Sequence, residues 1–227
     1  MSALVGSARS SEVTSSSKIR RPLLVLGLAA MALFGADTVA AANTHYLPPD
    51  VPVAQFIQSI NWGPLVWVFK RLDEIEGIRQ QLVAVAGILL IAAVNWRAAP
   101  LAIVTALSGG IYTITAMVIN RPRPSADLVQ VIHHTGASSY PSGHVAFFSW
   151  FLVMLILCIA VGRLPKPVVA LLWVAAAFLL LAVCIGRVYL GEHWPSDVVG
   201  GLALGFGWMF LALSWRWISN PVLARAK

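Results

Sequence analysis

The chain has 227 residues, of which 59% are hydrophobic and only 11% are charged. Apolar residues make up roughly 45–50% of a typical soluble domain, so this composition argues against a soluble globular protein and for one embedded in a membrane. The net charge of +7 does not indicate nucleic-acid binding, because the basic residues are distributed over the loops between apolar segments, as in a membrane protein.

Residues 1–17 are rich in Ser and Ala and lack apolar periodicity, which predicts a disordered tail. We assign residues 1–21 to this cytoplasmic tail and residues 22–227 to one all-α domain, a polytopic membrane helix bundle. Six mainly apolar segments have close to the roughly 20 residues that cross a bilayer. They are residues 23–42, 78–94, 99–119, 143–161, 168–185 and 198–217.

The first apolar segment has two interpretations. Lys18, Arg20 and Arg21, followed by an apolar run and then small residues up to Ala42, are also typical of a secretory signal with its cleavage region. Cleavage would leave five spans in an unchanged orientation. We favour an uncleaved span, and the mass of the mature N-terminus would decide between the two.

Residues 54–71 are apolar with interspersed polar groups and two Trp. This pattern predicts short helices at the membrane surface. Cys158 and Cys184 are expected at different depths and therefore unpaired. His133 and His134 are more simply solvated loop residues than contacts to a lipid headgroup, and we expect Glu192 to be exposed to solvent. The five histidines lack a compact metal-ligand spacing, so no metal site is predicted.

The loop charges predict the orientation of the domain. With six spans both termini lie on one side, which holds ten basic residues and a single acid, Glu12. The other side holds six basic residues and the eight remaining acids. Under the positive-inside rule the termini are cytoplasmic.

Three polar clusters fall on the opposite, outer face. Arg121-Pro-Arg-Pro follows the third span, YPSGH at 140–144 opens the fourth, and GRVYLGEHWPSD at 186–197 links the fifth to the sixth. Ionisable groups are costly in a membrane. Their gathering on one face therefore predicts a single site.

The second cluster has the features of an anion site. Ser142 is a good N-cap for the fourth helix, whose free N–H groups and positive dipole end favour phosphate. Gly143 permits close approach of an anion to the backbone. His144 would stand beside it as a proton donor.

The third cluster adds a histidine and an acid. His193 precedes the sixth helix and Asp197 lies in its first turn, so we expect the carboxylate to reach the imidazole and fix its tautomer. Arg187 ends the fifth helix, and Arg123 supplies a second guanidinium. Two such planar forks facing a helix N-terminus suit a tetrahedral oxyanion.

Together the three clusters resemble the signature of the type 2 phosphatidic acid phosphatase family, which also includes the soluble vanadium haloperoxidases. The resemblance extends from the third span to the sixth, with a motif core at 116–200. It implies a six-helix membrane phosphatase that hydrolyses lipid phosphate esters or anhydrides without metal or cofactor. Its implied partners are a lipid phosphate substrate and membrane lipids.

The resemblance also implies a role for each site residue. His193 is the nucleophile that takes the phosphoryl group, Asp197 supports it, and His144 protonates the leaving oxygen. A phosphohistidine would form and then be hydrolysed. The groups that would hold the phosphate are Arg123, Arg187, Ser142, the Gly143 amide and Arg121.

Two positions depart from the family pattern. The lysine expected seven residues before Arg123 is Ala116, and the serine expected before Arg187 is Gly186. Three functions therefore stay open. The first is a hydrolase of polyprenyl pyrophosphate, phosphatidate or phosphatidylglycerophosphate, with its site on the periplasmic face of a bacterial inner membrane. The second is a lipid-to-lipid phosphotransferase or a lipid A phosphatase, and the third is a non-catalytic membrane protein with a decayed site.

Overall fold

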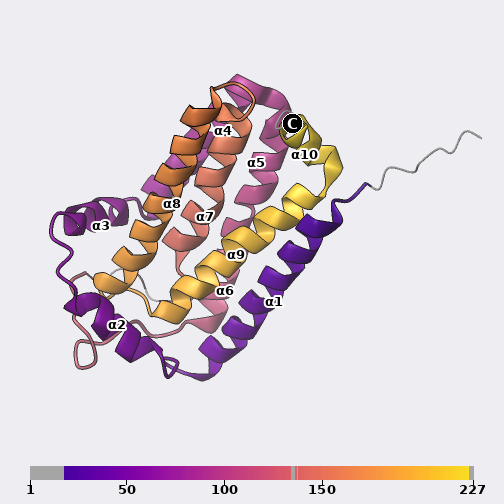
Figure 1. Ribbon diagram of the computed structural model, residues 1–227. Helices are drawn as coiled ribbons and strands as arrows, with labels where there is room; N and C mark the ends of the chain where they lie inside the picture. The colour runs from indigo at the N-terminus through magenta and orange to yellow at the C-terminus, as the bar shows by residue number, and fades with distance from the viewer. Residues whose placement is uncertain (1–17, 134–135, 137, 225–227) are drawn as a thin grey trace, which may run out of the picture.

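The computed structural model describes residues 18–133, 136 and 138–224. The expectations for the 1–17 tail and for His134 lie outside these residues. The described part is helical and confirms the predicted all-α class (Figure 1). Its helices are α1 (Arg21–Asn43), α2 (Asp50–Ser59), α3 (Leu65–Asp73), α4 (Gly77–Asn95), η1 (Trp96–Ala98), α5 (Ala99–Ala106), α6 (Ser108–Ile119), α7 (Gly143–Leu155), η2 (Ile156–Ala160), α8 (Lys166–Tyr189), α9 (Pro195–Ser214) and α10 (Arg216–Leu223).

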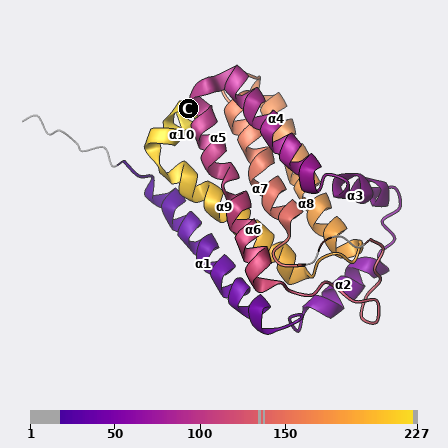
Figure 2. The ribbon, with the colours of Figure 1, turned by 180° about the vertical axis from the view of Figure 1, so that it is seen from behind.

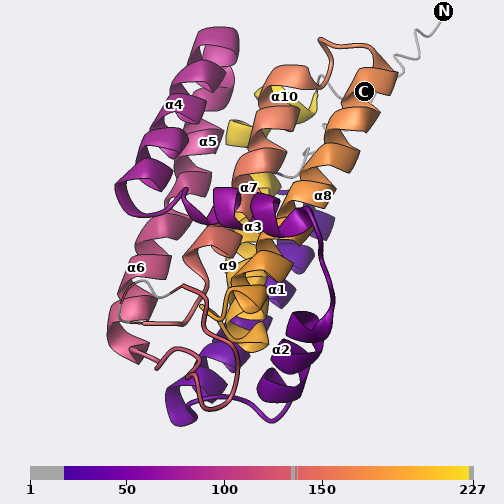
Figure 3. The same ribbon diagram turned by 90° about the vertical axis from the view of Figure 1, so that its left-hand side faces the viewer.

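Five helical segments of the described chain are long and apolar enough to cross a membrane. One of them, Gly77–Ile119, has 43 residues, about twice the length that a crossing requires. It folds back on itself at the 3₁₀ turn η1, so that α4 lies beside α5 and α6 continues away from the turn (Figure 3). The predicted second and third spans are the two arms of this hairpin.

Glycines of α9 allow its two neighbours to approach closely. A Cβ atom at Gly201 would lie 2.7 Å from the Ser142 carbonyl oxygen, and one at Gly207 would lie 3.0 Å from the Met31 sulfur. Helix α1 therefore packs along α9 over most of its length (Figure 2). The centre of the bundle is α7, where Phe147, Phe148, Trp150 and Phe151 contact one another.

The segment predicted to form surface helices contains α2 and α3. Helix α3 lies across the bundle against α8 (Figure 3), with Phe69 of α3 packed on Gly186. Its last residue, Asp73, is buried. The helix thus covers the end of α8, and its packing against the bundle was not apparent from its composition.

The C-terminal segment differs from the expectation. Helix α9 ends at Ser214, before the predicted end at 217, because Trp215 is extended and pairs with Ile19 in an antiparallel bridge. Helix α10 follows and was not predicted. The Arg20 guanidinium donates to the Asn220 side-chain oxygen at 2.6 Å. Both ends of the described chain therefore meet at one end of the bundle.

Candidate active site

The predicted site residues converge at the other end of the bundle. Helices α6 and α8 end there, and α7 and α9 begin there (Figure 1, Figure 2). The convergence predicted from the three clusters is thus present in the fold. The site side chains are almost inaccessible to solvent; they are Ser142, His144, Arg187, His193 and Asp197.

The two nitrogens of His193 have different surroundings. Nδ1 lies 2.6 Å from the Ser139 carbonyl oxygen, which fixes the proton on Nδ1. Nε2 has no hydrogen-bond partner in the described residues and can act as a nucleophile. Burial lowers the pKa of His193 well below its usual value, and the positive charges of Arg187 and Arg123 lower it further. The imidazole is therefore neutral at physiological pH.

The expected hydrogen bond between Asp197 and His193 is not formed. The carboxylate lies 3.8 Å from Nδ1. It instead accepts hydrogen bonds from the Ser139 hydroxyl, from the Trp194 N–H at 2.7 Å and from Arg121 at 2.5 Å. These three donors occupy the carboxylate, so Asp197 positions His193 indirectly, through Ser139.

Arg121 does not have the predicted phosphate-binding arrangement. It is buried, and its guanidinium contacts Asp50 at 3.1 Å, Asp197 at 2.5 Å and the Ser196 hydroxyl at 2.8 Å. Its Nε donates to the His45 carbonyl oxygen at 3.1 Å. Every guanidinium nitrogen is thus used within the protein, and Arg121 holds α2 and α9 together.

Arg123 and Arg187 meet at Glu192. The Glu192 carboxylate contacts Nη2 of Arg187 and lies 3.4 Å from Nη1 of Arg123. The expectation that Glu192 is exposed was wrong, because its side chain is fully buried between the two guanidinium groups. The Nε atoms of both arginines are buried without a hydrogen-bond partner in the described chain. The two forks therefore bind an oxyanion, here a carboxylate of the protein itself.

The start of α7 offers a free hydroxyl. Ser142 occupies the N-cap position but makes no capping hydrogen bond, and its buried Oγ has no partner among the described residues. A Cβ at Gly143 would lie 2.7 Å from the Tyr112 ring, so glycine allows Tyr112 to form a wall of the site. Nε2 of His144 lies 3.1 Å from the Asp73 carbonyl oxygen.

Two further residues of the site were not identified from the sequence. Asp73 forms an ion pair with Arg187, and His133 lies 2.9 Å from Asp73 and 2.8 Å from Glu192. Ligand atoms of Asp73, His133 and Glu192 lie within 4.8 Å of one another. Both carboxylates already contact Arg187, whose positive charge opposes a metal ion at this position. His133 therefore contacts both carboxylates, while its side chain remains about half exposed in the loop, as expected for a solvated loop residue.

The departure from the family pattern at Gly186 has a structural reason. A Cβ at Gly186 would lie 3.0 Å from the Phe69 Cβ. The glycine thus allows α3 to pack against α8 over the site. At the other departure, Ala116 leaves a small uncharged side chain on α6 in place of the family lysine, and nothing in the structure explains this replacement.

The apolar bundle and the arginine pair Arg123 and Arg187 define an integral membrane protein with an oxyanion site at one end. The chain belongs to the PAP2 superfamily, whose profile matches residues 97–221.

Similar proteins include an undecaprenyl-diphosphatase from Sulfolobus acidocaldarius, 37% identical over 75 residues, or 33% of this chain and 32% of that protein. A lipid A 1-phosphatase from Rhizobium etli is 31% identical over 131 residues, or 52% of this chain and 49% of that protein. The chain thus spans half or less of these relatives. The crystal structure of a transmembrane PAP2-type phosphatidylglycerolphosphate phosphatase from Bacillus subtilis matches with a TM-score of 0.66 and 21% identity, covering 85% of this chain and 94% of that one. This likeness confirms the fold.

Proposed function

We propose that this protein is a membrane lipid phosphatase that uses His193 as its nucleophile. The observation that carries the proposal is the arrangement of His193. Its neutral imidazole is held through Nδ1, with Nε2 unengaged, beside two guanidinium groups that bind an oxyanion. A nucleophile and a pair of phosphate-binding cations are the two components that phosphoryl transfer requires.

The reaction has two steps. Nε2 of His193 attacks phosphorus, the bond from phosphorus to the lipid oxygen breaks, and His144 protonates that oxygen. Water, deprotonated by His144, then attacks the phosphohistidine, which releases phosphate and restores the imidazole. Arg123, Arg187, the Ser142 hydroxyl and the first N–H groups of α7 stabilise the charge on the equatorial oxygens. For this step the phosphate displaces the Glu192 carboxylate.

A lipid phosphate is the substrate that these three similar proteins support. Their names describe phosphatases of an undecaprenyl diphosphate, of lipid A and of phosphatidylglycerolphosphate. Each of these substrates carries its phosphate on a lipid, which suits a site at the end of a membrane bundle. The charge distribution supports a periplasmic site in a bacterial inner membrane, because the site lies opposite the strongly basic end of the bundle.

Phosphate release by detergent-purified protein in the presence of EDTA tests the proposal. The substrates are undecaprenyl diphosphate, phosphatidate, phosphatidylglycerophosphate and lipid A 1-phosphate, each with wild type and His193→Ala. We expect release that survives the chelator and falls about a thousandfold or more in the variant. Equal release by both proteins would exclude the histidine mechanism. Release only after an acceptor lipid is added would identify a phosphotransferase.

A further inference from the structure

A cavity of about 380 Å³ adjoins the proposed phosphate site. It lies between α4, α6 and α7, and its lining includes Gly143 at the start of α7 and Tyr112 of α6. His144, which would protonate the leaving oxygen, is the next residue along α7. The part of the substrate that carries the scissile phosphate therefore has this cavity directly beside it.

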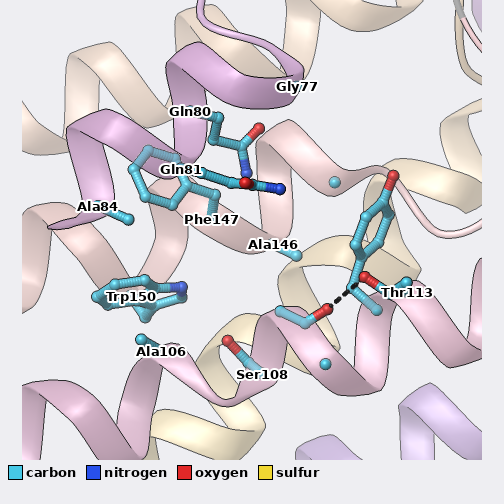
Figure 4. A pocket seen from close by; sticks show the side chains of 14 residues that line it. Gly77, Gln80, Gln81, Ala84, Ala106, Ser108, Thr113, Ala146, Phe147 and Trp150 are labelled. Carbon is cyan, nitrogen blue, oxygen red and sulfur yellow. Dashed lines mark hydrogen bonds between the residues drawn. The ribbon is translucent and has the colours of Figure 1, made fainter.

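The polar groups of the cavity carry no charge. Gln80 and Gln81 point from α4 into the cavity, and Ser108 lies on its opposite wall (Figure 4). None of these three side chains has a hydrogen bond to another described residue. They belong to a helical segment with the hydropathy of a membrane span, where unpaired polar groups are costly. Their free donors and acceptors suit a ligand that bears hydroxyl groups.

The lining contains no Lys, Arg or His that would neutralise a second phosphate. The two arginines at the scissile phosphate already face Glu192, and Arg187 also faces Asp73. Ala116 adds no positive charge on α6. A second phosphate in the cavity would therefore be desolvated without a counter-charge, which is strongly unfavourable.

We propose that Gln80, Gln81 and Ser108 form a subsite for an uncharged, hydroxyl-bearing group that carries the scissile phosphate. The preferred substrate is then a glycerol-linked or sugar-linked phosphomonoester of a lipid, and polyprenyl diphosphate is disfavoured. The apolar lining residues Ala84, Ala106, Phe147 and Trp150 contact the first carbons of its chains. This inference rests on the proposed phosphatase function and specifies its substrate class.

The test compares kcat/KM for three substrates: phosphatidylglycerophosphate, lipid A 1-phosphate and undecaprenyl diphosphate. We expect wild type to favour one of the first two at least about tenfold over the diphosphate, and which of them is favoured distinguishes glycerol from sugar. The double variant Gln80→Leu, Gln81→Leu is expected to lose about tenfold on the favoured substrate, mainly through KM, because its hydrogen bonds to the hydroxyl groups are lost. On the diphosphate its loss should stay within about twofold.

Two further variants test whether the change in substrate preference comes from the cavity. Ile78→Val changes an exposed side chain at the start of the same helix, outside the cavity lining, and should leave all three values unchanged. Gln80→Arg supplies the missing positive charge and should raise the relative kcat/KM for the diphosphate. A wild-type preference for the diphosphate, or equal losses on all three substrates in the double Leu variant, would overturn the subsite. A wild type that releases no phosphate from any substrate would overturn the phosphatase function, and the subsite with it.

Discussion

His193 depends on its neighbours for both its orientation and its protonation state. The Ser139 carbonyl fixes the proton on Nδ1, and Asp197 holds Ser139 in turn. Burial together with the nearby charges of Arg187 and Arg123 keeps the ring neutral. In the proposed reaction His193 is therefore prepared before the substrate arrives, and no proton has to leave Nε2 first.

The acid limb of the pH profile follows from the pKa of His193. Because this pKa lies well below 6.5, the neutral nucleophile persists below pH 6.5, and activity is lost only as pH falls through the lowered value. In Glu192→Gln the acid limb should move to still lower pH, because the Glu192 charge raises the pKa of His193. The measurement is kcat/KM against pH for both proteins.

Dividing the kcat/KM profile of the variant by that of wild type cancels the contribution of the ionisation of the substrate phosphate, which is the same for both proteins. A limb in wild type at or above pH 6.5, or a limb in the variant that moves to higher pH, would contradict this assignment.

Arg121 and Arg123 are two residues apart, but their substitution should affect different properties: stability for Arg121 and activity for Arg123. Arg121→Met leaves the buried Asp50 and Asp197 carboxylates without their partner, which should lower the free energy of unfolding by about 3–5 kcal/mol. Arg123→Met should lower kcat/KM by about a hundredfold or more with a smaller loss of stability, because Arg187 still pairs with Glu192. Thermal unfolding in detergent and phosphate release measure the two effects. A stable but inactive Arg121→Met protein would show instead that Arg121 acts on the phosphate.

At the scale of elements, α3 covers the proposed site. Its Phe69 packs on Gly186 of α8, its Asp73 carboxylate contacts Arg187, and its Asp73 carbonyl contacts His144. The helix therefore joins the packing of the bundle to two residues of the proposed reaction. A change in the position of α3 would alter both the ion pair between Arg187 and Asp73 and the surroundings of His144, the proposed proton donor.

Restoring the family serine at position 186 should disturb this contact. In Gly186→Ser the new side chain meets Phe69, so we expect a loss of about 1–3 kcal/mol in stability and a reduced rate of phosphate release. Adding Phe69→Ala makes room for the serine, so the double variant should lose less than the sum of the two single losses. Thermal unfolding of the four proteins gives the coupling energy. If the two single losses in stability simply add in the double variant, the contact between residue 186 and Phe69 does not limit the approach of α3.

The elements were more predictable than the contacts between them. Hydropathy located the spans, and the motif spacing brought His144, Arg187 and His193 to one site. The roles of Asp50 and Asp73 were not predictable, because they depend on how α2 and α3 fold back over the bundle, and no periodic pattern encodes that path. The Ser139 carbonyl as the partner of His193 was not predictable either, because Ser139 lies in the loop between α6 and α7, whose path has no periodic pattern.

At the scale of the whole molecule, the proposed site and the meeting point of the described termini lie at opposite ends of the bundle. The described termini meet at one end through Ile19, Trp215 and the Arg20–Asn220 hydrogen bond, and the proposed site occupies the other end. This arrangement agrees with an even number of crossings. The charge distribution then predicts which end faces the cytoplasm.

Cysteine labelling of intact cells tests the orientation. In a background of Cys158→Ala and Cys184→Ala, Asp127→Cys lies in the loop after α6 at the site end, and Lys166→Cys lies at the first residue of α8. Both positions are exposed. A membrane-impermeant maleimide should label only Asp127→Cys in cells whose outer membrane is permeable to it, and both positions after lysis. The reverse pattern in intact cells would place the site in the cytoplasm.

The pairing of Glu192 with Arg123 and Arg187 also bears on how the product leaves. Glu192 is tethered beside the two guanidinium groups, so its effective concentration there is far above that of any dissolved anion. Free inorganic phosphate must compete with it without the additional binding energy that a lipid gains from its chains. The enzyme would therefore be weakly inhibited by its own product, and it would discriminate against soluble phosphates without a separate device to exclude them.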